Sequence, residues 1–369
     1  MSKNVRLTAR RTAAPRIKAT VLLTGTAIAL VTMPAAASAA PAAPVISEIA
    51  TPGVESFNIA AGPDGSVWYT AIGSNSRLEV GEIPAGGQPA YFSNGIFQSG
   101  QDGEAGDLGP ITLGPDDNLW FTQSAGPSSA GAGVVYRISS GVGNSGDGPL
   151  GTVKYERAGG ILPNVFGITG GPGGRVYFTE TSDAIDPPVG PAEEVGSMGV
   201  HGGVTAGIPG APSIPGAIAE DGEGNLWFAE PSSEEIARLT PAGVITQIPV
   251  GVVVRDITVG PGGNLWFTSD NAIGTLSPSG TGLRLFPVPA LVDPDQITTG
   301  PDGNLWFTDS NPETANGRES GELGTITTAG AVTMFSQGIT GLATFGIAAT
   351  PTQVWFTEGA SDRLGVVSF

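Results

Sequence analysis

Cysteine is absent from the 369-residue chain, and histidine occurs only once. The lack of cysteine excludes disulfides, thiolate metal sites, thiol catalysis and a lipid-modified N-terminal cysteine. The sequence G-x-S-x-G is also missing, and a Ser–His–Asp triad would depend on the single histidine, His201. These absences remove the commonest nucleophilic hydrolases from consideration.

Basic residues are scarce, and six of the 16 lie in the first forty positions. They precede an apolar run over residues 19–33, which is followed by the small-residue sequence Ala37-Ser38-Ala39. This order predicts a secretory signal peptide over residues 1–39 and one mature domain over residues 40–369. A retained membrane anchor is the alternative, but a span needs about 20 apolar residues. We therefore expect bacterial-type export to the extracellular space, with no membrane insertion after cleavage.

Acidic residues dominate the mature chain. Loss of the six basic residues leaves ten Lys and Arg against 34 Asp and Glu, a net charge of −24. Binding to phosphate backbones needs clustered basic side chains, so nucleic acid is excluded as a partner. Anionic membrane surfaces are excluded for the same reason. We expect a monomer that binds a small molecule, a peptide or a glycan.

One short sequence recurs along the chain: "GPDDNLWFT" at 114–122, "GPGGNLWFT" at 260–268 and "GPDGNLWFT" at 300–308. Seven copies align on one aromatic position, and all six tryptophans of the chain fall there. The seven positions are Trp68, Trp120, Tyr177, Trp227, Trp266, Trp306 and Trp355. A core repeat of about forty residues is the size of a four-stranded propeller blade. An open β-solenoid is the alternative.

The last repeat supplies only three strands before the chain ends at Phe369. The missing strand has a counterpart near the start, because "VISEIATP" at 45–52 resembles "VITQIPVG" at 244–251. The sequence therefore predicts an all-β, seven-bladed β-propeller whose N-terminal strand completes the last blade. Such closure leaves no long unpaired edge.

The repeats "GITGGPGGRVYFTE", "GPDGNLWFTDS" and "WFTEGASDRLGVV" resemble those of the virginiamycin B lyase (streptogramin lyase) propellers. The resemblance covers residues 45–369 and implies the propeller type more specifically than the reaction. It implies an elimination that opens a cyclic depsipeptide ester. In that chemistry a histidine base removes a proton, and Mg²⁺ held by carboxylates stabilises the developing charge.

The longest and most varied loops are predicted on one face, at the ends of the second strands, so we place the site there. One ring of side chains ends the second strands, and a second ring precedes the innermost strands. The first ring is Ala71, Gln123, Glu180, Glu230, Ser269, Asp309 and Glu358. The second is Phe57, Gly109, Phe166, Gly216, Arg255, Asp295 and Phe345. We expect a ligand funnel lined by Phe57, Phe166, Phe345, Glu180 and Glu230.

Three acidic residues of the sixth blade form the sharpest cluster: Asp293, Asp295 and Asp309. Carboxylates suit Mg²⁺ or Ca²⁺, so this cluster is the candidate metal site. The alternative is that Asp293-Pro294-Asp295 is a polar loop with a turn proline. The glutamates at one repeated register have an alternative role too, which is to bind loop backbone. The sequence "DGEGN" at 221–225 resembles a calcium loop, but its register predicts a turn.

The sequence does not supply the histidine base that a lyase of this family would need at the funnel. His201 aligns with a turn on the opposite face, so we do not expect it to reach the funnel. The remaining catalytic candidates are Asp295, Arg255 and Glu358. Two other functions stay open: a non-catalytic extracellular ligand-binding propeller, and a gluconolactonase-type metal-dependent hydrolase. The hydrolase would use carboxylates with amides such as Asn271, Asn311 and Asn316.

Overall fold

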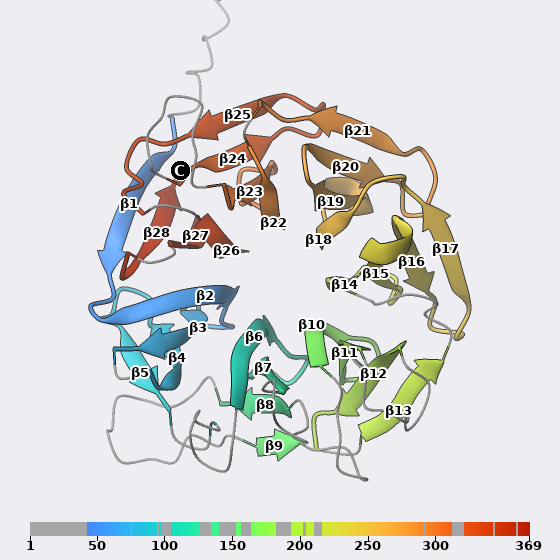
Figure 1. Ribbon diagram of the computed structural model, residues 1–369, viewed down its shortest axis with the longest axis horizontal. Coiled ribbons are helices and arrows are strands. Elements are labelled where there is room, and N and C mark those ends of the chain that lie inside the picture. Colours follow the sequence, from blue (N-terminus) through green and yellow to red (C-terminus); the bar gives the residue numbers. More distant parts are fainter. Residues whose placement is uncertain are drawn as a thin grey trace, which may run out of the picture. The chain divides into compact units, whose positions relative to one another are not determined.

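The computed structural model describes residues 43–74, 76–93, 96, 105–125, 134–139, 153–155, 164–181, 193–201, 204–209, 216–290, 292–311, 321–341, 344–358 and 361–369. Residues 42–369 form one compact unit. Its strands make seven four-stranded antiparallel sheets, arranged as blades around a common centre (Figure 1). The predicted seven-bladed propeller is confirmed. The predicted signal peptide lies outside the described residues.

The first four blades follow the chain in order. Blade 1 contains β2 (Val54–Ala61), β3 (Val67–Gly73), β4 (Leu78–Ile83) and β5 (Ala90–Phe92). Blade 2 contains β6 (Ala105–Leu113), β7 (Leu119–Ala125), β8 (Val134–Ile138) and β9 (Val153–Tyr155). Blade 3 contains β10 (Asn164–Gly171), β11 (Arg175–Thr181), β12 (Glu193–Gly199) and β13 (Val204–Pro209). Blade 4 contains β14 (Ile218–Glu220), β15 (Leu226–Glu230), β16 (Glu235–Leu239) and β17 (Ile245–Pro249).

The remaining blades include the closing one. Blade 5 contains β18 (Val254–Val259), β19 (Leu265–Ser269), β20 (Ala272–Leu276) and β21 (Arg284–Pro287). Blade 6 contains β22 (Pro294–Thr299), β23 (Leu305–Asp309), β24 (Leu323–Ile326) and β25 (Val332–Phe335). Blade 7 contains β26 (Thr344–Ala349), β27 (Gln353–Glu358) and β28 (Arg363–Ser368). Two 3₁₀ turns, η1 (Pro231–Ser233) and η2 (Pro261–Gly263), are the helical segments of the described residues.

The N-terminal strand β1 (Val45–Ala50) is the fourth strand of blade 7, as the sequence predicted. It pairs antiparallel with β28, from Val45 opposite Ser368 to Ala50 opposite Arg363. The innermost strands also contact one another in an unbroken cycle, in which β26 of blade 7 meets β2 of blade 1. The ring is therefore closed by a noncovalent seam between the two ends of the propeller (Figure 1).

The core lies between the blades, because the second strand of each blade is covered on both faces. In β15, β19 and β23 every residue is buried. Each of the seven hydrophobic clusters among the described residues joins two adjacent blades. In one of them, Trp306 of blade 6 packs with Ile347 and Phe356 of blade 7. Burial of aromatic side chains between sheets supplies most of the apolar stabilisation of such a fold.

In blades 1, 2, 4 and 6 the turn before the second strand accepts the indole N–H of the buried tryptophan. In blade 6 the Asp302 carboxylate accepts the Trp306 indole N–H at 3.1 Å and the Asn304 side-chain amide at 2.7 Å. In blade 4 the Asp221 carboxylate accepts the Trp227 indole N–H at 2.8 Å. Asp221 therefore organises a turn, as its register predicted.

The third strand adds a packing requirement. Its glycine lies under the phenylalanine ring of the second strand, and a Cβ at Gly324 would come within 2.1 Å of the Phe307 ring. The repeated glycine in "LGTI" is therefore fixed by packing rather than by backbone conformation.

Candidate functional site at the loop face

The candidate site lies where the second strands end and the inner strands begin, which we call the loop face. Six of the seven inner strands carry a β-bulge at this end, between equivalent residues of each blade. The first bulge residue is the member of the inner ring predicted from the sequence. A bulge re-aims the side chains next to it and is common beside functional sites. The bulges thus place two successive residues of six blades at this end of the inner strands.

Threonines of the second strands connect the bulges of neighbouring blades. The Thr308 hydroxyl accepts the Gln296 backbone N–H at 3.0 Å and donates to the Phe345 carbonyl of the next blade at 2.7 Å. The same pair of bonds is made by Thr70, Thr179, Thr268 and Thr357. In five of the seven blades the threonine at this position is therefore an inter-blade link, a role that the sequence analysis did not assign.

The second bulge residue forms another set of contacts near the axis, and these residues were also missed. The Asp256 carboxylate of blade 5 accepts the Ile297 backbone N–H of blade 6 at 2.8 Å. The Gln296 side chain of blade 6 accepts the Ile347 N–H of blade 7 at 3.3 Å. Gln296 also donates to the Asn58 side-chain oxygen of blade 1 at 2.8 Å. The available signal was the first letter of "DITVG", "QITTG" and "NIAAG".

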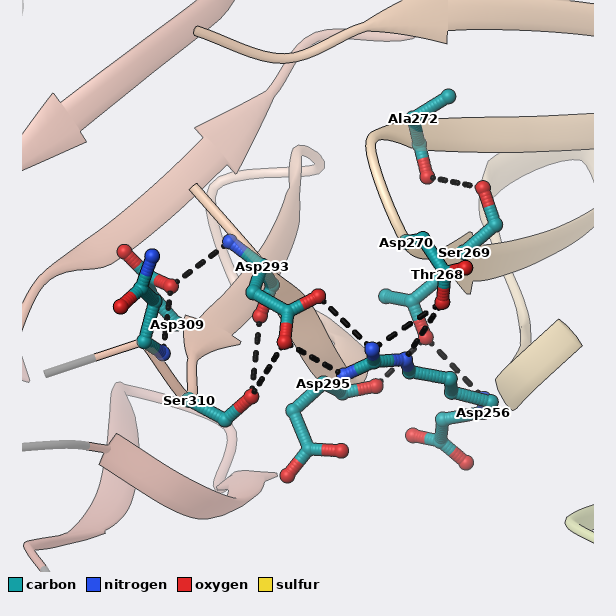
Figure 2. A network of polar contacts seen from close by, with 11 residues as sticks. Asp256, Thr268, Ser269, Asp270, Ala272, Asp293, Asp295, Asp309 and Ser310 are labelled. Atoms are coloured by element: carbon teal, nitrogen blue, oxygen red, sulfur yellow. Dashed lines mark hydrogen bonds and ion pairs between the residues drawn. The ribbon is translucent and has the colours of Figure 1, made fainter. Parts of the chain in front are cut away.

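Arg255 is the centre of the charged part of the loop face. Its guanidinium donates to both Asp293 oxygens, at 2.9 and 3.0 Å, and to Asp270 at 3.1 Å. Asp293 belongs to blade 6, and Asp270 lies in the β19–β20 turn of blade 5. Figure 2 shows Asp293 and Asp270 on the two sides of this network of contacts. Arg255 therefore holds the loops of blades 5 and 6 together.

The three predicted metal ligands lie close together but have different partners. Asp309 is buried, and one of its oxygens accepts the backbone N–H groups of Asp293 and Asn311 at 2.9 and 3.0 Å. Asp293 faces Arg255, and Ser310 donates to it at 3.3 Å. The Asp295 carboxylate points away from both of them (Figure 2). Two of the three therefore already serve as hydrogen-bond acceptors within the loops.

The described residues contain no group of three or more carboxylate or histidine side chains placed to hold a metal ion. The metal site over Asp293, Asp295 and Asp309 therefore stays a prediction, and no chemical step is derived from it.

Several carboxyl groups here have perturbed acidity. Burial raises the pKa of Asp256 to about 7, even though the N–H groups of Ile297 and Ile257 oppose the shift. Burial also raises the pKa of Asp295, with Arg255 opposing and Asp293 adding to the shift. Burial raises the pKa of Asp309 as well, despite its two N–H donors. A carboxyl group with a raised pKa keeps its proton to a higher pH than an ordinary surface carboxyl group does.

The repeated glutamates point along their blades toward the outer strands. Glu230 is fully buried, and its carboxylate accepts the Gln247 side-chain amide of the outermost strand at 3.0 Å. Glu358 is fully buried as well and accepts the Gly341 N–H at 2.7 Å. Glu180 is buried at the same register. Glu358 therefore binds loop backbone, which is one of the two roles that the sequence allowed.

The predicted aromatic residues occupy the first bulge position in blades 1, 3 and 7. Phe166 has an exposed fraction of 47%, which is high for a phenylalanine. Phe57 and Phe345 are partly buried, and their backbone carbonyls accept the threonine links from blades 7 and 6. Aromatic side chains therefore occupy one part of the ring, and the charged residues of blades 5 and 6 occupy the other.

The only histidine lies far along the blade from this site. His201 is exposed in the turn between β12 and β13. That turn follows Gly199, which pairs with Arg175 at the start of β11, whereas the loop face is at the other end, where Glu180 pairs with Glu194. The predicted position of His201 on the opposite face is confirmed.

Closed four-stranded blades around an axial ring of side chains define this chain as a seven-bladed propeller with a candidate site at the loop face. The sequence profile of the Virginiamycin B lyase family matches residues 164–369. The match covers more than half of the chain, and the chain belongs to this family.

Solved structures give the same fold. A catalytically inactive histidine-to-alanine virginiamycin B lyase from Staphylococcus aureus, solved with quinupristin, has a TM-score of 0.67 and 22% identity, covering 89% of this chain and 100% of that one. A streptogramin B lyase structure has a TM-score of 0.66 and 20% identity, covering 88% and 97%. An extracellular domain from B. thetaiotaomicron has a TM-score of 0.60 and 12% identity, covering 85% and 39%. A search of the curated proteins gave no match.

A search of the described residues for a helix long and apolar enough to cross a membrane found none.

Proposed function

We propose that this chain is an exported propeller of the virginiamycin B lyase family that binds a small molecule or peptide at its loop face, without the histidine-dependent elimination of a streptogramin lyase. The observation that carries the proposal is the position of the single histidine. A virginiamycin B lyase with a histidine-to-alanine change is catalytically inactive, and here His201 lies at the other end of blade 3. Among the described residues, the bulges of the inner strands bring Arg255, Asp256 and Asp295 to the loop face.

Binding is supported by the composition of the loop face. Phe166 exposes an aromatic ring that could stack on an apolar part of a ligand. Arg255 and Asp270 are partly exposed, with side-chain exposed fractions of 30% and 62%, and offer a donor and an acceptor. A rigid ring of bulged strands holds these groups in place, which lowers the ordering cost of binding. The extracellular domains among the structural relatives support export.

The test is a combined binding and turnover assay with a type B streptogramin. Calorimetry measures binding, and mass and ultraviolet spectra follow the ligand with Mg²⁺ or with EDTA. Elimination would leave the mass unchanged and add a double bond. Binding without turnover supports the proposal, and loss of binding in Arg255→Ala but not in His201→Ala would assign it to the loop face. Turnover would contradict the non-catalytic part. If the streptogramin does not bind, the streptogramin-like ligand class is ruled out, and other cyclic peptides and glycans are tested.

An elimination that uses a carboxylate base is the second candidate. One observation favours it: burial raises the pKa of Asp256 to about 7, beside the cationic Arg255. A base with that pKa is suited to abstract a proton at neutral pH. In that case Asp256→Asn would abolish turnover while leaving streptogramin binding intact. The hydrolase alternative has no comparable observation, since Asn271 contributes a backbone carbonyl to Val288 and Asn316 lies outside the described residues.

A further inference from the structure

The seam that closes the ring contains a pair of acidic side chains, of which Glu358 is fully buried and Glu48 is partly buried. Glu48 lies on the N-terminal strand β1, and Glu358 lies at the end of β27, the second strand of the same blade. Consecutive amides of one loop bind the two carboxylates: Thr340 N–H donates to Glu48 at 2.5 Å, and Gly341 N–H donates to Glu358 at 2.7 Å. The loop between blades 6 and 7 thus ties both ends of the chain together.

The two acids differ in their remaining partners. Glu48 also accepts from Arg363 of β28 at 2.6 Å, so it has a cationic partner. Glu358 is fully buried, and its second oxygen has no donor among the described residues. The two carboxylates are neighbours, because the amides that bind them are consecutive in the chain. Two ionised carboxylates only accept hydrogen bonds, so a hydrogen bond between them needs a proton on one of them.

Blade 4 makes the corresponding contact without a proton. Glu230 occupies the register of Glu358, and Gln247 occupies the register of Glu48, as the alignment of "VITQIP" with "VISEIA" shows. The Gln247 amide donates to the Glu230 carboxylate at 3.0 Å. An amide is a donor at every pH, whereas a carboxyl group is a donor only when protonated. The seam of blade 7 therefore replaces a permanent donor with a titratable one.

We propose that this seam is a proton-dependent latch, in which protonated Glu358 donates a hydrogen bond to Glu48 and thereby holds β1 against β28. The latch is engaged at mildly acidic pH and weakened at neutral pH. Its moving part is the N-terminal strand, which pairs with β28 along one edge and contacts the loop at Thr340 through Glu48. The latch residues belong to blade 7, whereas Arg255 and Asp270 of the proposed ligand site belong to blade 5.

The electrostatic surroundings of Glu358 agree with this direction. Burial raises its pKa to about 7, and the charge of Glu48 adds to the shift, while Gly341 and Arg363 oppose it. Asp362, in the turn before β28, is directed to the Gly53 N–H. The other neighbouring positions, 342–344 and 359–361, carry no titratable side chain. When the pKa of a carboxyl group is raised in the folded seam, the full stabilisation is present at a pH below the ordinary glutamate pKa. This stabilisation is lost as the pH rises toward 7.

Hydrogen exchange of the purified protein between pH 4.5 and 8 tests the latch. Protection factors of the β1 amides, corrected for the pH dependence of chemical exchange, are compared with those of β17, the outermost strand of blade 4. Linkage to one proton lowers the protection of β1 by at most tenfold per pH unit up to about pH 7, and then it levels off. The protection factors of β17 should change with pH much less than those of β1, because the Glu230–Gln247 pair needs no proton. A constant β1-to-β17 ratio in the unaltered protein would overturn the proposal, whether or not any variant folds.

Variants then assign the effect to the pair. Glu48→Gln copies the pair of blade 4, and Glu358→Gln supplies a permanent donor, so each should remove the pH dependence of β1 protection. Glu82→Gln is the matched control, because Glu82 is also a buried acid, in blade 1, whose pKa burial raises to about 7. It should leave the β1 dependence unchanged. Retention of the full dependence in Glu48→Gln or Glu358→Gln, or its loss in Glu82→Gln, would contradict the latch.

Discussion

The Gln296 side chain donates a hydrogen bond of 2.8 Å to Asn58, a residue 238 positions away in the sequence. Gln296 belongs to blade 6 and Asn58 to blade 1, so the bond passes across the inner strand of blade 7. Blade 7 has Gly346 at the equivalent position, where a Cβ would come within 2.4 Å of the Phe57 carbonyl oxygen. The missing side chain thus accompanies a direct link between blades that are not neighbours in the ring.

Removing this link should destabilise the closed ring. Gln296→Ala leaves the Ile347 N–H and the Asn58 side chain without their partner, and a lost hydrogen bond to a buried group costs about 1–3 kcal/mol. We expect Asn58→Ala to cost less, because Gln296 keeps its bond to Ile347. Urea unfolding of the two single variants and the double variant measures the coupling. Additive effects would show that the Gln296–Asn58 bond does not contribute to stability.

The threonine links should contribute a comparable free energy to the stability of the fold. Thr308→Val keeps the shape of the side chain but removes the hydroxyl that joins the Gln296 N–H to the Phe345 carbonyl. Both backbone groups then lose a partner, and we expect a loss of about 1–3 kcal/mol. Thr333→Val, on the exposed side of β25, is the matched control and should change stability by less than about 0.5 kcal/mol. Equal effects of the two substitutions would contradict the link.

Much of this fold could be predicted from the sequence because each blade repeats the same local pattern. The seven aromatic anchors, the turn at Asp221 and the closing strand from Val45 all follow from the repeat. The roles of Asn58, Asp256 and Gln296 could not be predicted in the same way. Their partners belong to other blades, and their direction depends on a β-bulge that has no letter of its own in the sequence.

The candidate site could likewise be predicted from the sequence only in part. The sequence indicated that Asp293 and Asp309 lie together near the axis, because equivalent strand ends meet there. It did not indicate that Arg255 would take both oxygens of Asp293, since that contact crosses from one blade to the next. The contacts between blades decide which carboxylates already have a hydrogen-bonding partner. A set of metal ligands inferred from sequence spacing alone therefore stays a prediction.

Stability should fall as the pH rises from about 4.5 to about 7. Burial raises the pKa of Glu82, Asp256 and Glu358 to about 7, so the folded state keeps protons that the unfolded chain releases. Each group contributes a slope of at most about 1.4 kcal/mol per pH unit over that window. Urea unfolding at a series of pH values measures the slope, and Asp256→Asn should reduce it. A stability that rises between pH 5 and 7 would contradict the assignment.

The acid side of the stability profile should be set by the turn aspartates. Indole and amide donors lower the pKa of Asp116 and Asp221 although burial acts in the opposite direction. Their contribution is present above the ordinary aspartate pKa of about 4 and is lost as the pH falls below it. Stability is therefore lost below about pH 4 through these aspartates and above about pH 5 through the carboxyl groups whose pKa is raised. The maximum should lie near pH 4 to 5. Asp221→Asn should weaken the acid-side loss, and thermal melts between pH 2.5 and 5 measure it.

Deleting the closing strand should cost more than any single substitution. Removal of residues 40–56 exposes the edge of β28, leaves Arg363 without Glu48 and opens the cluster in which Ile49 packs against Leu364 and Val366. Loss of a strand with this burial should destabilise the domain by at least about 3 kcal/mol, a fall of several degrees or more in Tm. Val45→Ala, at a position with an exposed fraction of 65%, is the control and should leave Tm unchanged. A synthetic peptide of residues 43–56 added to the truncated protein should raise its Tm in a concentration-dependent way. An unchanged Tm for the truncated chain would show that blade 7 is stable with three strands and that the seam does not close the ring.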